Sequence, residues 1–367
     1  MAKLFEPLNT RTHVRFCNSA DGTALAFTVI GSGSPLMWIS LQYTDNDLVS
    51  PGPASKHWMA ALAARHTVIR FDMRGCGLSE RKPVRMSLDA WIEDIEAVVN
   101  AAGLTRFAMV SVCTGSYAAI EYAARHSHRL TQLVLYGGSV RGRLLRDLSP
   151  AQRDDALSAV QVYETGLNGH SEFGQFFRRV FTARFFPDAS AEQLDAMDSI
   201  LVQRMNGTVA AQSVREFYNL DLTTRAQLIK TPALVLHASN DILYPIAEGL
   251  QLAACIPGAR FVKIESNNNT PLAEEPVWPQ VQNAVLDFLG NHSNDPASAV
   301  HLTVRQCEVL RYVVQGFTDK QIARSLSLSP RTVEMHVSAA LRALGSKTRA
   351  EAAHRVTQQG LLCATVA

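Results

Sequence analysis

Ser111-Val112-Cys113-Thr114-Gly115 is the stretch that decides how the first part of the chain folds. It follows a short apolar run, residues 107–110, and precedes a helix-prone run, residues 116–125. This order predicts a strand, a sharp turn and a helix, with a thiol placed on the turn. The sequence therefore poses one question, which is whether Cys113 is a nucleophile or part of the floor of a binding pocket.

Short apolar runs and helix-prone segments alternate on both sides of this turn. The apolar runs are residues 14–29 (two strands around an Asp21-Gly22 turn), 36–39, 67–71, 107–110, 133–136, 233–237 and 260–264. Alternation of this kind indicates an α/β fold with a parallel sheet covered on both faces. Residues 140–230 show no strand pattern and are rich in aromatic side chains, so we expect a helical lid there. Its aromatic residues either form a core or line a cavity beneath the lid.

The charge of the chain is unevenly distributed. The 367 residues carry a net charge of +2. From His301 onward there are nine Lys or Arg against four acidic residues, so this end carries +5 and the remainder −3. A basic end on a mildly acidic body indicates contact with a polyanion.

Composition also bounds the organisation and the compartment. The polar stretch before His301 contains Gly and Pro, and it predicts a linker at 291–300 between domains at 1–290 and 301–367. The six cysteines form no C-x-x-C pair, which favours reduced thiols in a cytoplasmic protein. The first residues lack a signal-peptide core, and no apolar run reaches the length of a membrane span. We expect no metal and no cofactor.

Four segments, in order, resemble motifs of the α/β-hydrolase family. They are Gly31-Ser32-Gly33 before a central strand, Asp72 to Ser79 (D-x-R-G-x-G-x-S), Ser111 to Gly115 at the nucleophile elbow, and Leu234 to Asp241 at the strand that ends in H-G-x-x-D. The resemblance implies an α/β-hydrolase fold over the first 290 residues. It also implies a triad of nucleophile, acid and histidine in that chain order.

The triad implied by this resemblance is incomplete. Cys113 occupies the nucleophile position and Asp241 the acid position. Residues 269–276 match the family pattern H-x-P-x-x-E-x-P, but Asn269 stands where the family has histidine. An amide cannot take a proton near neutral pH, and a thiol without a base is mostly protonated. We therefore expect no efficient turnover, unless a histidine from elsewhere in the fold replaces the missing base.

The same positions can form a binding pocket instead. The family's H-G after the first central strand falls at Ser40-Leu41, and Gln42 follows. We expect Gln42, Cys113, Thr114 and Asn269 to contact the polar head of a mainly apolar ligand. Simpler roles stay open: Cys113 as a buried filler, Asp241 as a hydrogen-bond partner of Asn269, and His237 as a partner for a strand end.

The last part of the chain resembles the LuxR-type helix-turn-helix family. The matching segments are residues 302–310, 316–323, 326–337 and 344–352. Thr318 and Ser329 are expected to cap two of its helices, with Pro330 at the first position of the second. The family reads DNA with its third helix, which implies a set of DNA-contacting residues here. This set is Lys320, Arg331, Thr332, His336, Arg342 and Lys347.

Together these features predict a ligand-responsive transcriptional regulator. Its hydrolase-like domain binds a small-molecule effector, and its tail binds double-stranded DNA, as a homodimer on paired half-sites. The alternative is an active cysteine-nucleophile hydrolase fused to a DNA-binding domain. A third hypothesis is a first domain that only mediates dimerisation or contact with a partner.

Overall fold

The computed structural model describes residues 13–40, 48–166, 172–204, 206–290, 304–326, 328–343, 346 and 348–358. Contacts divide the chain into two units, residues 1–290 and 291–367, and each is described by itself. The predicted linker lies outside the described residues. No helix of the described ranges is both long enough and apolar enough to cross a bilayer.

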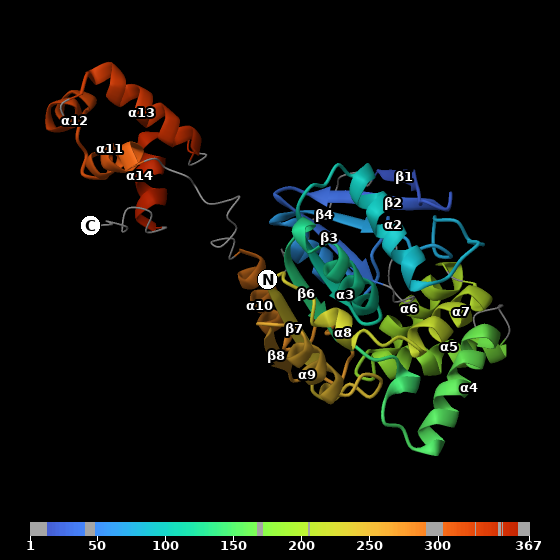
Figure 1. Ribbon diagram of the computed structural model, residues 1–367. Helices are drawn as coiled ribbons and strands as arrows, with labels where there is room; N and C mark the ends of the chain where they lie inside the picture. The colour runs from blue at the N-terminus through green and yellow to red at the C-terminus, as the bar shows by residue number, and fades with distance from the viewer. Residues whose placement is uncertain are drawn as a thin grey trace. The chain divides into compact units, whose positions relative to one another are not determined.

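The first unit is built on one sheet (Figure 1). In the described residues its strands are β1 (Val14–Asn18), β2 (Ala24–Gly31), β3 (Ser34–Ser40), β4 (His66–Phe71), β5 (Phe107–Val112), β6 (Leu130–Tyr136), β7 (Ala233–Ala238) and β8 (Arg260–Ile264). They lie in the order β1-β2-β4-β3-β5-β6-β7-β8. β2 pairs antiparallel with β1 and β4, and the pairs from β4 to β8 are parallel. The predicted parallel sheet is thus confirmed, with an antiparallel hairpin at one edge.

Helices cover both faces of this sheet, as the alternation predicts. On one face α1 (Lys56–Ala63) and α10 (Trp278–Gly290) pack in one apolar core. On the other face lie α2 (Leu88–Ala101), α3 (Gly115–Arg125) and α9 (Ile246–Cys255). β5 is buried along its whole length. Val110 packs in the core that contains α1 and α10, and Met109 packs in the core on the opposite face of the sheet. The strand that leads to Cys113 is therefore held from both sides.

The insert between β6 and β7 is helical. After a short 3₁₀ turn, η2 (Arg143–Leu145), it contains α4 (Pro150–Gly166), α5 (Glu172–Phe185), α6 (Ala191–Arg204), α7 (Gly207–Tyr218) and α8 (Thr223–Ala226). Helices α4 to α7 gather beside the sheet (Figure 1). The end of α6 is tied to the loop after β4, because Gly77 N donates to Arg204 O at 2.8 Å and Arg204 pairs with Asp72. The lid is thus fastened to the body at this point.

The D-x-R-G-x-G-x-S segment forms a buried scaffold. The guanidinium of Arg74 donates to both oxygens of Asp94, at 2.8 and 2.6 Å, and to Asp21 at 2.7 Å. These contacts tie the β1–β2 turn to α2. Ser79 Oγ donates to Asp72 O at 2.6 Å and accepts from Ala26 N at 2.9 Å. The motif therefore joins three parts of the body.

The second unit consists of short helices around a small core. They are α11 (Val304–Val314), α12 (Asp319–Leu326), α13 (Pro330–Ala343) and α14 (Arg349–Gln358). Ser329 Oγ accepts from Thr332 N at 3.1 Å, so the predicted cap of α13 is confirmed, with Pro330 at its first position. At the start of α12 the side chain of Thr318 donates a hydrogen bond rather than accepting one as a cap would. Gln321 Oε1 accepts from Thr318 N and from Thr318 Oγ, both at 2.8 Å.

Candidate functional site

Cys113 occupies a strained turn at the carboxyl end of β5. Its φ is 49°, and among the described residues it is the non-glycine residue with a positive φ. Such a conformation costs on the order of 1–3 kcal/mol, so the surroundings must impose it. Cys113 N donates to Tyr136 O at 2.8 Å, and a Cβ on Gly115 would lie 2.8 Å from Ile39 O. The predicted strand, sharp turn and helix are confirmed, and the close approach explains the glycine.

Asp241, in the acid position after β7, is fully engaged. Its Oδ1 accepts from Leu243 N at 2.8 Å and from Tyr244 N at 3.0 Å. Its Oδ2 accepts from Asn269 Nδ2. Burial raises the pKa of Asp241, and the hydrogen bonds from Tyr244 and Asn269 oppose that rise. The simpler role considered for Asp241, a hydrogen bond that fixes the loop of Asn269, is confirmed.

Asn269 lies beside the elbow, where the histidine of a hydrolase triad would stand. A Cβ on Gly137 would lie 3.2 Å from Asn269 Nδ2, and Gly137 follows Tyr136, whose carbonyl accepts from Cys113 N. The side chain of Asn269 is fully buried. Its backbone N–H donates to Phe185 O of the lid at 2.8 Å. The structure thus brings the three triad positions together with an amide in place of the base.

Two histidines near this site, His237 buried and His57 half-buried, bond to backbone carbonyls. His237 Nε2 lies 2.6 Å from Tyr244 O, and its ring is completely buried. His57 Nε2 lies 2.9 Å from Pro271 O, with its ring edge-on to Trp278. A carbonyl can only accept, so Nε2 carries the proton in both rings. His237 therefore satisfies the end of β7 in the way the sequence suggested.

His57 makes stability depend on pH. Burial lowers the pKa of His57 to about 4 from 6.5. Between these values the unfolded chain takes up a proton that the folded chain excludes, so the free energy of unfolding falls as pH falls from about 6.5 to about 4. We expect a loss on the order of 1–3 kcal/mol, measured by urea unfolding of the first unit. His57→Gln should abolish this component, whereas His128→Gln, at an exposed residue, should keep it.

The predicted ligand-binding residues are placed differently from one another. Thr114 lines a cavity under the lid, and within the described part of the chain its buried hydroxyl has no hydrogen-bond partner. Cys113 packs instead against Phe185, Tyr244 and Leu272, in an apolar cluster that closes over the elbow. Neither Cys113 nor Asn269 is among the described residues that line this cavity. Gln42 lies outside the described residues.

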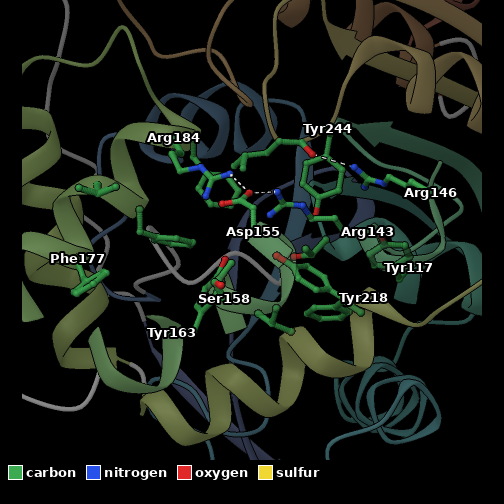
Figure 2. A pocket seen from close by; sticks show the side chains of 18 residues that line it. Tyr117, Arg143, Arg146, Asp155, Ser158, Tyr163, Phe177, Arg184, Tyr218 and Tyr244 are labelled. Atoms are coloured by element: carbon green, nitrogen blue, oxygen red, sulfur yellow. Dashed lines mark hydrogen bonds and ion pairs between the residues drawn. The ribbon is translucent and has the colours of Figure 1, made fainter. Parts of the chain in front are cut away.

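This cavity, of about 180 Å³, lies between the elbow and the lid helices (Figure 2). Its aromatic lining is Tyr117, Tyr163, Phe177, Phe181, Phe185, Phe217, Tyr218 and Tyr244, and its charged lining is Arg143, Arg146, Asp155 and Arg184. Both roles expected for the aromatic residues of the insert occur, because Phe186 is core and Phe181 lines the cavity. Sequence reasoning missed the charged set, although three arginines and an acid in a lid were a usable signal.

The described residues contain no cluster of His, Cys, Asp and Glu that can hold a metal ion. Cys76 lies half-buried in the loop after β4, where burial raises the pKa of its thiol to about 12. Among the described residues the cysteines Cys17, Cys76, Cys113 and Cys255 are free thiols.

The outward face of α13 is the candidate DNA-reading surface. At about 100° per residue, one row carries Arg331, Met335, Ser338 and Arg342, opposite the buried Val333, Val337 and Ala340. Arg331 and Met335 are exposed, and so is Lys320 on α12. Sequence reasoning missed Met335 and Ser338, although the helical period places them beside Arg331.

The other predicted DNA contacts vary in their surroundings. Thr332 Oγ lies 2.7 Å from Ser329 Oγ in the cap of α13. His336 is half-buried at the side of the helix. The side chain of Arg342 and the whole of Lys347 lie outside the described residues.

Comparison with known proteins gives two family matches and many relatives. The putative carbamate hydrolase RutD of Klebsiella pneumoniae (strain 342) is 25% identical over 219 residues, 58% of this chain and 79% of its own length. The pyrrolizixenacetamide deacetylase of Xenorhabdus hominickii is 23% identical over 216 residues, 58% of this chain and 77% of its own length.

Solved structures resemble the first unit in fold. The esterase EaEST of Exiguobacterium antarcticum has a TM-score of 0.66 at 18% identity, over 75% of this chain and 99% of its own. The enol-lactonase of Burkholderia xenovorans LB400 has a TM-score of 0.62 at 20% identity, over 76% of this chain and all of its own.

The family matches fall on the two units separately. The family described as "alpha/beta hydrolase fold" matches residues 49–276, and "Bacterial regulatory proteins, luxR family" matches residues 300–356. The first match spans more than half of the chain. The chain belongs to the α/β-hydrolase fold family and continues into a LuxR-type helix-turn-helix domain.

Proposed function

We propose that this protein is a cytoplasmic, ligand-responsive transcriptional regulator that binds double-stranded DNA as a homodimer. Its hydrolase-like domain binds a small, mainly apolar molecule without efficient turnover. A ligand acts on DNA binding only through a difference in its affinity for two arrangements of the protein. The basic LuxR-type domain supports the DNA-binding half of the proposal.

One observation carries the absence of turnover: the amide of Asn269 donates to Asp241 in the place of the catalytic histidine. Asp241 thereby orients a side chain that has no proton to exchange. The cavity beside Thr114 supports ligand binding, because its lining is mainly aromatic and it lies next to the elbow. An elbow region filled by side chains, with no cavity, would have favoured the hypothesis of a domain that only mediates dimerisation.

DNA binding can be tested on the outward row of α13. Arg331→Ala is expected to weaken binding roughly tenfold, because an exposed arginine at the start of a recognition helix reaches a base edge or a phosphate. The measurement is fluorescence anisotropy on an operator selected from a random-sequence library. Arg311→Ala is the matched control, since α11 packs on the buried row of α13. Equal losses for the two variants would contradict this orientation of the domain.

The ligand half of the proposal has its own experiment. Native mass spectrometry of the full chain identifies what copurifies, and anisotropy on the selected operator is then measured with and without that molecule. We expect a shift of the dissociation constant for DNA. Should no small molecule bind, or should the bound molecule leave DNA affinity unchanged, the proposal fails.

The alternative is an active hydrolase fused to a DNA-binding domain. Two observations favour it: the relatives carry hydrolase names, and the strained turn and buried acid of the family are retained at Cys113 and Asp241. Turnover of a chromogenic short-chain ester by the unaltered protein, abolished in Cys113→Ala, would support the alternative over the regulator without turnover.

A further inference from the structure

Two arginines share one carboxylate at one side of the cavity. Arg143 of η2 donates through Nη2 to Asp155 Oδ2 at 2.5 Å, and Arg184 Nη2 of α5 lies 3.8 Å from the same oxygen. Figure 2 shows the three side chains in a row, with Asp155 between the guanidinium groups. One negative charge faces two positive charges here, so this row carries a surplus positive charge.

Arg184 is the member with unused hydrogen-bonding capacity. A separation of 3.8 Å is too long for a hydrogen bond, and within the described residues Arg184 makes none. Arg146, by contrast, donates to Leu243 O at 3.0 Å and Ser139 Oγ at 3.3 Å, and its guanidinium lies over the ring of Tyr244. Arg146 is therefore part of the wall, and Arg184 presents free donors to whatever enters the cavity.

The rest of the lining limits the shape and size of the occupant. Aromatic rings from α3, α4, α5 and α7 surround the space, and flat rings pack best against flat rings. A dry apolar cavity of about 150 Å³ holds one benzene molecule. At about 180 Å³, this cavity has room for one ring and a short polar substituent.

We propose that the cavity binds a monocyclic aromatic carboxylate, whose carboxylate is held by Arg143 and Arg184 in competition with Asp155. This inference rests on the proposed function and adds the chemical class of the effector. A planar guanidinium group binds a carboxylate through two parallel, charge-assisted N–H donors. A ligand with an amide or an ester in place of the carboxylate forms weaker hydrogen bonds with it. The ring then lies among Tyr163, Phe177 and Phe181.

Asp155 allows a test in which the proposal predicts tighter, not weaker, ligand binding. Asp155 occupies the place of the ligand's carboxylate, so Asp155→Asn frees both arginines and should tighten binding several-fold. A purely structural role for Asp155 would instead weaken binding or leave it unchanged. The side chain is 57% exposed, so the variant is expected to fold, and a thermal melt checks this.

The experiment uses calorimetry on the full chain with benzoate and phenylacetate as probes. Phenylacetamide tests the need for the charge, and hexanoate tests the need for the ring. Arg184→Met should weaken phenylacetate binding roughly tenfold or more, since it removes charge-assisted hydrogen bonds. Arg179→Met is the matched control on the same helix, because its side chain is as exposed as that of Arg184 and does not line the cavity.

Several results would overturn the inference. They are no binding of either aromatic carboxylate at millimolar concentrations, equal binding of phenylacetamide or hexanoate, or binding by Asp155→Asn that is weaker or unchanged. Operator anisotropy separates this failure from failure of the proposed function. If another molecule binds and changes DNA affinity, the regulator stands without this ligand class. If phenylacetate binds as predicted and DNA affinity does not change, the site stands without the regulatory role.

Discussion

Asn269→His is expected to hydrolyse a short chromogenic ester about 10²–10⁴-fold faster than the unaltered protein, the usual contribution of a positioned general base. Asp241 Oδ2 already accepts from the side chain at position 269, so it can hold the new imidazole through one ring nitrogen. The strained turn presents Cys113 beside that loop. The substitution thus restores the component that the site lacks.

The double variant Asn269→His, Cys113→Ala is the control, and it should return the rate to that of the unaltered protein. Steady-state rates with the chromogenic ester decide between the outcomes. A gain that survives the loss of Cys113 would show that the thiol is not the nucleophile. Absence of any gain would show that the elbow no longer presents Cys113 for attack.

Arg74→Met is expected to lower the free energy of unfolding of the first unit by about 3–5 kcal/mol, the usual cost of breaking a buried ion pair. Both Arg74 and Asp94 are buried, and removal of the guanidinium leaves the Asp94 carboxylate without its main partner. Contact with Arg74 also holds the pKa of Asp21 well below its usual range. Burial raises the pKa of Asp94, so without Arg74 the variant should take up a proton at Asp94 on folding.

Urea unfolding at neutral pH measures this loss. The matched control is Arg85→Met, which removes an arginine that also pairs with Asp21 but is 44% exposed. Exposed pairs contribute about 0–1 kcal/mol, so the control should change stability little. Similar losses for both variants would mean that the network acts through Asp21 alone rather than through the buried pair.

The sequence predicted the fold well because its decisive signals are local. The strand before Cys113 must turn sharply against β3. This explains both the apolar run that precedes Cys113 and the need for glycine at position 115. Ser329 and Pro330 mark the start of α13 through the chemistry of helix caps. The pairing of Asp241 with Asn269 was foreseeable, because the family pattern places both positions at one edge of the sheet.

The cavity was harder to predict, because it depends on contacts between distant segments. Arg143, Asp155 and Arg184 come from three separate elements, and no spacing in the sequence brings them together. Cys113 and Asn269 were expected to contact the ligand, and that expectation remains a prediction, with Leu272 and the lid packed over the thiol. The recognition face was predicted in part, since Met335 has no charge to draw attention to it.

The hydrogen bond from Asn269 N to Phe185 O has a kinetic consequence. The loop that carries Asn269 is also bonded to the lid through Asn268 Oδ1, which accepts from Asp188 N at 3.0 Å. In many enzymes the opening of a lid for product release limits turnover, so tight fastening slows the catalytic cycle. The regulator proposed above converts nothing and therefore has no product to release. In such a regulator the fastened lid would give a bound molecule a long residence time, so the proposed signal would outlast a brief fall in effector concentration.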